Sequence, residues 1–283
     1  MTPEEIKKRI VVGLFSDDEL LDLLVLKGGN ALEMVHAIAD RASFDLDFSI
    51  ATRFDDVKEI EQRIRKALER EFARVDLVVF DLSLEERPLK RSARVPDWWG
   101  GYQVGFKLAD RALFERYGGD IERVRREAVV VGPQEKRIYK IDISAYEFVR
   151  TKQRDELDDL TVYVYSLEMI VIEKLRAICQ QMERYPYNTT RSPRARDFFD
   201  ICQIMKVKAI DLTAKENVDL AQDIFQAKQV SMELLNAIAD TREFHRSDWD
   251  SVRDSVRGET LAFDAYFDSV LKLVAGLKLS WKM

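Results

Sequence analysis

Two aspartates one residue apart, Asp45 and Asp47, stand in a segment from Phe44 to Ile50 in which apolar and polar residues alternate. A period of two is typical of a half-buried β-strand, so both carboxylates are expected on one face, roughly 6–7 Å apart. Like charges this close repel each other, and strands disfavour aspartate. A hard divalent cation that prefers oxygen ligands would compensate for both costs. The two aspartates are therefore candidate metal ligands.

Two glycines, Gly28 and Gly29, stand between a short apolar run that ends at Leu26 and a helical pattern from Asn30 to Ala39. Glycine lets the backbone turn tightly and approach a ligand, and a turn that opens a helix offers N–H groups to phosphate. Together with the aspartates, the order strand, glycine turn, helix and strand predicts a site for a metal and a phosphate. The alternative is an ordinary glycine turn beside a solvated strand face, which would be the better interpretation of an isolated Asp-x-Asp.

The elements that position these residues follow from periodicity and capping. The segment 136–144 predicts a strand with Lys140, Asp142 and Ser144 on one face. Residues 145–160 are charged and aperiodic and predict a linker, and beyond a short strand at 161–165 the pattern is helical. Further helices are expected at 2–12, 55–72, 110–126 with a break at 118–119, 216–227, 232–240 and 261–277, and further strands at 74–84 and 102–108. The fold class is therefore α/β (α+β), with an α/β domain at 1–160 and a helical domain at 161–283.

The helical half opens after Ser166, a good N-cap, with a helix whose apolar stripe includes Lys174. A lysine on an apolar face needs a partner or a function, whereas Glu173 and Arg176 are expected to point away. The next helix carries Asp197 at the edge of its apolar side, so antiparallel packing would bring Lys174 and Asp197 together. A buried salt bridge that only fixes the helix packing is the alternative to a chemical role.

The segments Gly28–Leu32 and Arg41–Phe48 resemble motifs of the AbiEii/AbiGii toxin family, which are nucleotidyltransferases of the DNA polymerase β-like superfamily. The gap from the glycines to the aspartates is longer than the usual superfamily spacing, as in the toxin branch. The segments Glu173–Ala177 and Arg196–Asp200 resemble the downstream motifs of the same branch. The resemblance implies a polymerase β-like mixed sheet with flanking helices and a C-terminal helical lobe, with the active site in the cleft between the two lobes.

The resemblance also implies a reaction, the Mg²⁺- or Mn²⁺-dependent transfer of a nucleotide from an NTP to an acceptor hydroxyl with loss of pyrophosphate. Asp45 and Asp47 would bind the metal. The strand of Asp142 would lie beside theirs, so that Asp142 joins the metal site and helps to position or deprotonate the acceptor. An ordinary surface acid near Lys140 is the alternative interpretation of Asp142.

Other residues would hold the nucleotide. By resemblance, the expected contacts are Lys27, Gly28, Gly29, Arg41, Ser43 and Lys174. Arg41 could instead pair with an acid. Lys174 would neutralise charge on the leaving group, and Asp197 would be a further essential acid.

Any contact with nucleic acid must be local, because the formal net charge of the chain is −6. The segment 184–196 holds four arginines, two tyrosines and no acid. Arginine suits phosphate and tyrosine can stack on a base, so Arg184, Arg191 and Arg194 are candidate RNA contacts. A helix–helix loop with solvated charges is the alternative. By resemblance, the 3′ end of tRNA is the leading acceptor.

Two rival functions stay open. One is a nucleotidyltransferase that modifies a small molecule or a protein, and the other is a non-catalytic nucleotide-binding module that acts through partners. The resemblance further implies a toxin–antitoxin or phage abortive-infection system. Its antitoxin would be a DNA-binding regulator, which in this type of pair is thought not to need direct contact with the toxin.

Composition sets the cellular context. With 46% apolar and 34% charged residues, the chain has the profile of a soluble globular protein with a sizeable core. No apolar run approaches a membrane span and the polar N-terminus lacks a signal-peptide core, so a cytoplasmic protein is expected. Cys179 and Cys202 lack metal-ligand spacing and are expected to be reduced core residues, and His36 and His245 are too few for a multi-histidine zinc site.

Overall fold

The structure is a computed structural model that describes residues 1–38, 45–89, 96–131, 136–188 and 190–281. The chain packs as two compact units. The first consists of Met1–Asn30, Ser43–Arg91 and Trp99–Val164, and the second of Ala31–Ala42, Ser92–Trp98 and Tyr165–Met283. The domain limits 1–160 and 161–283 stay a prediction.

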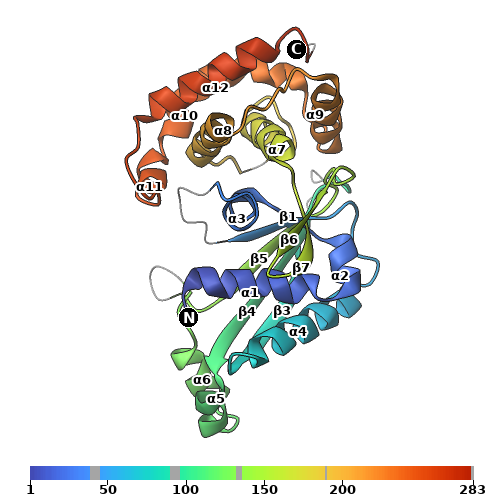
Figure 1. Cartoon of the computed structure of the whole chain (residues 1–283), viewed down its shortest axis with the longest axis vertical. Coiled ribbons are helices and arrows are strands. Elements are labelled where there is room, and N and C mark those ends of the chain that lie inside the picture. Colours follow the sequence, from blue (N-terminus) through green and yellow to red (C-terminus); the bar gives the residue numbers. More distant parts are fainter. Residues whose placement is uncertain (39–44, 90–95, 132–135, 189, 282–283) are drawn as a thin grey trace. The chain divides into compact units, whose positions relative to one another are not determined.

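A mixed sheet is the centre of the first unit (Figure 1). Its described strands lie in the order β3-β4-β5-β2-β1-β7-β6, with β2 parallel to β5 and β1 parallel to β7. The strands are β1 Val25–Lys27, β2 Leu46–Ser49, β3 Leu77–Arg87, β4 Gly101–Asp110, β5 Tyr139–Ser144, β6 Gln153–Leu157 and β7 Leu160–Val164. The predicted α/β class, and the predicted pairing of the Asp-x-Asp strand with the strand of Asp142, are confirmed.

The predicted linker at 145–160 is wrong in part, because β6 lies within it and forms a hairpin with β7. This strand is at the edge of the sheet, and only Leu157 at its end is buried. An edge strand with charged side chains shows little alternation of apolar and polar residues, so the sequence offered no period to detect.

Two amphipathic helices cover one face of this sheet. Helix α1 (Pro3–Phe15) begins with a capping box at Thr2, and α4 (Val57–Ala73) presents its apolar stripe to β3, while the short α2 (Asp18–Leu23) lies next to both. Ring contacts fix the arrangement: Phe72 of α4 lies 6.3 Å from Phe106 of β4, and Phe106 stacks on Tyr139 of β5 at 5.4 Å. Because side chains alternate along β5, Asp142 faces away from α4.

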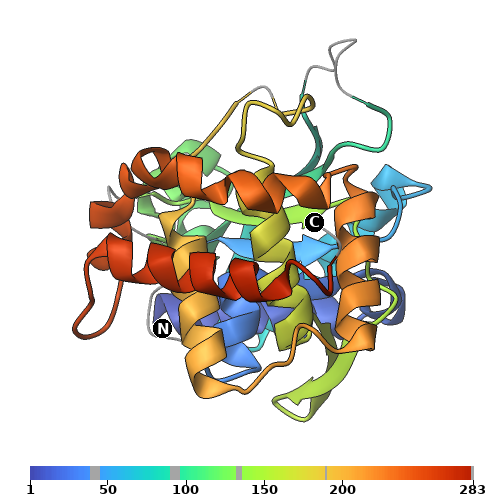
Figure 2. The same cartoon turned by 90° about the horizontal axis from the view of Figure 1, so that it is seen from above.

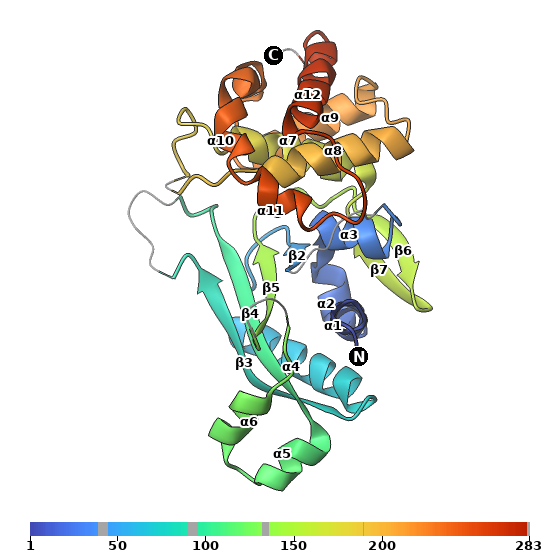
Figure 3. The ribbon, with the colours of Figure 1, turned by 90° about the vertical axis from the view of Figure 1, so that its left-hand side faces the viewer.

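A helical hairpin packs on the far ends of β3 and β4 (Figure 3). Its helices are α5 (Arg111–Tyr117) and α6 (Ile121–Glu127), and the chain turns between them at Gly118, where φ is +47°. The predicted break at Gly118–Gly119 is therefore confirmed.

The second unit is helical in its described part. Its elements are α7 Leu167–Cys179, α8 Ala195–Val207, α9 Lys215–Ala227, the 3₁₀ helix η2 Met232–Thr241, α10 Arg242–Arg246, α11 Trp249–Arg253 and α12 Phe263–Leu277. Helix α7 contacts α8, α9 and η2, which makes it the central helix of the unit (Figure 2). The predicted N-cap Ser166 of α7 is confirmed, and so are the predicted helices α7, α8, α9 and α12, whereas the short α10 and α11 were not expected. None of the helices in the described ranges is both long and apolar enough to span a membrane.

Candidate active site

A row of polar side chains crosses the sheet of the first unit, and its centre is a pair of aspartates. Asp47 of β2 lies opposite Asp142 of β5, in parallel register. Lys27 of β1 lies opposite Asp47 on the other side, and Gln103 of β4 lies opposite Asp142. Paired residues on neighbouring strands share a face, so these four side chains are neighbours on the face that α1 and α4 leave uncovered.

Asp45, the first of the two predicted aspartates, lies just before β2 and is exposed. Its backbone carbonyl accepts a hydrogen bond of 2.5 Å from Nδ2 of Asn30, a residue with no exposed surface. Asn30 therefore fixes the entry into the Asp-x-Asp strand. Sequence reasoning assigned no role to Asn30, although a polar residue directly after two glycines was a usable signal.

The predicted glycine corner is present. Strand β1 ends at Lys27, and helix α3 (Gly28–Met34) begins at Gly28 in the next position. Gly28 has a φ of +69°, and a Cβ at this residue would lie 3.0 Å from Oδ2 of Asp47. The corner thus approaches one of the aspartates closely and accepts only glycine without strain.

Lys27 is buried within the same polar layer. Its Nζ donates a hydrogen bond of 3.2 Å to Oγ of Ser144 and lies 3.9 Å from a carboxylate oxygen of Glu147. Its predicted contact with nucleotide stays a prediction. The other two predicted nucleotide contacts of this region, Arg41 and Ser43, lie outside the described residues.

The carboxylates of this site are a partial donor set for Mg²⁺. The described residues contain no cluster of three or more His, Cys, Asp or Glu side chains that could enclose a metal. Mg²⁺ in nucleotide enzymes, however, is usually held by one or two carboxylates plus substrate phosphates. The facing carboxylates of Asp47 and Asp142 fit that type of site. Asp45 as a third ligand stays a prediction.

A buried ionic network in the second unit contains the other two predicted catalytic residues. Nζ of Lys174 on α7 lies 2.8 Å from Oδ1 of Asp197 and 2.7 Å from Oδ2 of Asp200, both on α8. The exposed fractions of these residues are 4%, 1% and 4%. Nε of Arg194 lies 2.5 Å from the other oxygen of Asp197. The predicted approach of Lys174 to Asp197 is confirmed, whereas its part in catalysis stays a prediction.

Charge keeps Asp197 ionised in this network. Burial by itself would raise the pKa of the Asp197 carboxyl, but the positive charges of Arg194, Lys174 and Arg196 outweigh it and hold the pKa well below its usual range. Asp197 is therefore a carboxylate in this network rather than a neutral carboxyl group.

The beginning of α8 is capped by residues that follow it by about fifty positions. The N–H of Arg194 donates to Nδ1 of His245 at 3.0 Å, and the N–H of Ala195 donates to Oδ1 of Asp248 at 3.2 Å. Burial lowers the pKa of His245 to about 4; the negative charge of Asp197 opposes this shift and the positive charge of Arg194 adds to it. The ring is therefore neutral near pH 7 and can accept this bond. Sequence reasoning missed both caps.

Arg176 contradicts the prediction that it points away from the core. It is 2% exposed, and its Nη2 donates to Oε1 of Glu173 at 3.1 Å. The prediction failed because α7 is the central helix of its unit, so its polar side is enclosed as well as its apolar stripe.

The arginine- and tyrosine-rich segment is only partly available to a ligand. Tyr185 is 2% exposed and its hydroxyl donates to the carbonyl of Lys228 at 2.8 Å, so this tyrosine is not available to stack on a base. Arg184 and Arg191 are exposed, and Arg191 lies 3.1 Å from Glu183. Arg194 belongs to the ionic network. RNA contact by these three arginines stays a prediction.

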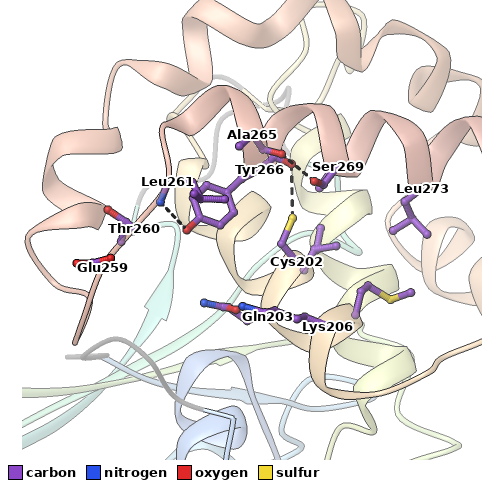
Figure 4. A pocket seen from close by; sticks show the side chains of 13 residues that line it. Cys202, Gln203, Lys206, Glu259, Thr260, Leu261, Ala265, Tyr266, Ser269 and Leu273 are labelled. Carbon is purple, nitrogen blue, oxygen red and sulfur yellow. Dashed lines mark hydrogen bonds between the residues drawn. The ribbon is translucent and has the colours of Figure 1, made fainter.

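A cavity of about 630 Å³ lies between α8, α12 and residues 259–261 of the second unit (Figure 4). None of the predicted site residues lines it. The Cys202 thiol points into it and donates to the carbonyl of Tyr266 at 3.5 Å. Burial raises the pKa of Cys202 to about 11, so the thiol is protonated near pH 7. Both cysteines are free, as expected, but only Cys179 is fully buried.

Comparisons with known proteins find one family model and several similar solved structures. Residues 9–269 match the family model described as nucleotidyl transferase AbiEii toxin, type IV TA system. The crystal structure of JHP933 from Helicobacter pylori has a TM-score of 0.50 and 17% identity, and the alignment covers 99% of this chain and 94% of that chain. An antigenic nucleotidyltransferase-like protein from Paracoccidioides brasiliensis has a TM-score of 0.42 and 14% identity, with 92% and 97% covered. No curated protein matches the chain. At this identity, the likeness to JHP933 establishes the fold alone.

Proposed function

Because the chain belongs to the AbiEii family of nucleotidyl transferase toxins of type IV toxin–antitoxin systems, we propose that it transfers a nucleotide from an NTP to the 3′ end of tRNA in a reaction that requires Mg²⁺ or Mn²⁺. One observation carries the proposal: two carboxylates, Asp47 and Asp142, lie opposite each other on adjacent strands, next to the glycine corner at Gly28. This arrangement supports binding of a metal together with the phosphates of a nucleotide.

The first unit would supply most of the chemistry. Asp47 and Asp142, with Asp45, would hold the metal, which when bound withdraws charge from the phosphates. The backbone N–H groups of Gly28 and Gly29 would bind phosphate oxygens. Asp142 would also orient the acceptor hydroxyl and accept its proton. Lys27, and Arg41 and Ser43 outside the described residues, would contribute further contacts to the nucleotide.

The second unit would supply a positive charge. We propose that transfer also requires Lys174, whose ammonium can neutralise charge on the leaving pyrophosphate, and Asp197, which holds that ammonium. The alternative is that the Lys174–Asp197 pair serves only the packing of α7 on α8.

The proposed acceptor and partners are inferred from membership of the family. The proposal takes tRNA as the acceptor, with Arg184, Arg191 and Arg194 as candidate contacts. A DNA-binding antitoxin would be the cognate regulator, and the proposed location is the cytoplasm. The two rivals are transfer to a small molecule or a protein, and a nucleotide-binding module without catalysis.

The test is incubation of the protein with each labelled NTP in the presence of tRNA, total cell protein and a metabolite extract. We expect label at the 3′ end of tRNA. Asp47→Asn should lower transfer by roughly 100-fold or more, because the loss of a metal ligand removes several kcal/mol of transition-state stabilisation. The matched control is Asp159→Asn at the exposed turn between β6 and β7, which should transfer as the unaltered protein does.

The outcomes separate the rivals. If label enters protein or metabolites and never RNA, tRNA is not the acceptor. If Asp47→Asn stays toxic in cells, the module without catalysis is the better explanation.

A further inference from the structure

A chain of hydrogen bonds holds the carboxylate of Asp142. It crosses the sheet from β5 through β4 to β3, which is an edge strand. Nε2 of Gln103 on β4 donates to Oδ1 of Asp142 at 2.8 Å, and Nη2 of Arg87 on β3 donates to Oε1 of Gln103 at 2.7 Å. We infer that Gln103 is a positioning residue for Asp142, and that Arg87 positions Gln103. The inference rests on the proposed function, since it assigns these residues to the metal and acceptor site at Asp142.

The direction of the chain follows from the donors available. An arginine side chain has five N–H donors and no acceptor, so only the amide oxygen of Gln103 can face Arg87. The amide is planar, and its NH₂ group must then face Asp142. Arg87 therefore removes the alternative orientation of Gln103, in which the amide oxygen would repel the Asp142 carboxylate.

The charge pattern also suits a metal site. Gln103 is neutral, so it orients Asp142 without neutralising the negative charge that a cation requires. The positive charge of Arg87 is one side chain further away and is balanced by Glu85, 3.0 Å from its Nη2. Across the described ranges, no side chain other than Gln103 donates a hydrogen bond to the Asp142 carboxylate. Among the described residues, therefore, no side-chain donor competes with a ligand for its second oxygen.

The backbone keeps this geometry in place. Gln103 lies opposite Asp142 in the antiparallel pair β4–β5, and Glu85 lies opposite Gln103 in the pair β3–β4. Two residues from Gln103, Gly101 brings β4 so close to β5 that a Cβ would overlap the carbonyl oxygen of Ile143. Paired strands fix side chains more firmly than loops do, which is what a positioning residue needs.

The experiment compares Gln103→Leu, which keeps bulk but removes the donor, with Arg87→Leu and with the double variant. The control is Ser83→Ala on the same face of β3, opposite Gly105 and outside the hydrogen-bond chain. The first readout is the binding of Mn²⁺ in the presence of a non-hydrolysable analogue of the NTP that the protein uses. Electron paramagnetic resonance measures this binding. The second readout is kcat/KM for transfer, and melting temperatures report on folding.

We expect Gln103→Leu to weaken Mn²⁺ binding and to lower kcat/KM, each by about 10- to 100-fold, the range seen when residues that support metal ligands are removed. Arg87→Leu should shift both quantities in the same direction by less. In the Gln103→Leu background, Arg87→Leu should have no further effect, because its action passes through Gln103. Ser83→Ala should match the unaltered protein.

Two results would overturn the inference. One is a Gln103→Leu variant whose Mn²⁺ binding and kcat/KM equal those of the unaltered protein. The other is an Arg87→Leu variant that binds Mn²⁺ as tightly as the Ser83→Ala variant does. This second result would be decisive even if Gln103→Leu folds poorly. Either result in a protein that transfers nucleotide leaves the proposed function intact. If the unaltered protein neither transfers label nor binds Mn²⁺ with any NTP analogue, the proposed function fails, and this inference with it.

Discussion

At the scale of single residues, the Lys174 ammonium lies between two carboxylates, 2.8 Å from Asp197 and 2.7 Å from Asp200, with almost no exposed surface. Moving three charges out of water is expensive, and their mutual attraction offsets that expense only while all of them are present. A role of Lys174 in stability therefore exists whether or not it acts in catalysis, and the two must be measured separately.

Replacing Lys174 by methionine tests the stabilising role. Lys174→Met leaves Asp197 and Asp200 buried without their shared cation, and we expect the free energy of unfolding to fall by about 3–5 kcal/mol. Denaturant unfolding measures this change. The control Lys206→Met, at an exposed position of α8, should stay within roughly 0.5 kcal/mol of the unaltered protein.

A loss smaller than about 1 kcal/mol for Lys174→Met would contradict the buried network. If the loss is as large as expected, inactivity of this variant is evidence for catalysis only at a temperature where the variant is shown to be folded.

At the scale of elements, α8 depends on caps from distant parts of the chain. Its N-cap residue, Arg194, supplies no side-chain cap of its own, and His245 and Asp248 accept the first N–H groups instead. The cap from His245 requires a neutral ring, because a protonated imidazole has no acceptor. This element therefore links folding to pH.

We expect stability to fall as the pH drops from about 6.5 to 4. The pKa of His245 is lowered from 6.5 to about 4 in the folded protein, so in this window the unfolded chain binds more protons. The full effect corresponds to about 3 kcal/mol, present above pH 6.5 and lost toward pH 4. His245→Asn, whose amide oxygen can accept the same bond without titrating, should flatten this part of the curve of unfolding free energy against pH. An equally steep curve for this variant would exclude His245 as the cause.

A second element-scale prediction concerns the close pairing of β4 and β5. Gly101→Ala should destabilise the protein and lower transfer activity, because the added Cβ would overlap the carbonyl oxygen of Ile143 and push apart the strands that carry Gln103 and Asp142.

Gly276 in α12 is the matched control, because a Cβ there meets no atom within 4 Å. Gly276→Ala, in the last turn of α12, should therefore stabilise by about 0.4–1 kcal/mol, because alanine reduces the conformational entropy of the unfolded chain. The measurement is the melting temperature of both variants. Similar melting temperatures for the two would contradict the close contact at Gly101.

At the scale of the whole molecule, the proposed catalytic residues are divided between the two units. The facing aspartates and the glycine corner belong to the first unit, and the network of Lys174 and Asp197 belongs to the second. The second unit also holds a cavity that no proposed catalytic residue lines. Toxicity, if it depends on transfer, should therefore be sensitive to substitutions in both units, and Asp47→Asn and Lys174→Met should each abolish it.

The sequence by itself determined the order of strand, glycine corner, helix and Asp-x-Asp strand, and the caps at Thr2 and Ser166. These features depend on residues within one turn or one strand of each other, so their periods and spacings are visible in the chain. The resemblance then placed the strand of Asp142 beside the Asp-x-Asp strand.

Only the tertiary structure decided which distant residues support the site. Arg87, Gln103 and Asp142 meet across three strands, and His245 reaches α8 from about fifty positions away. The burial of Arg176 likewise depends on the helices that surround α7. A hydrogen-bond partner is selected by distance in space, and a side chain is buried by whatever packs over it, so neither leaves a local period in the sequence.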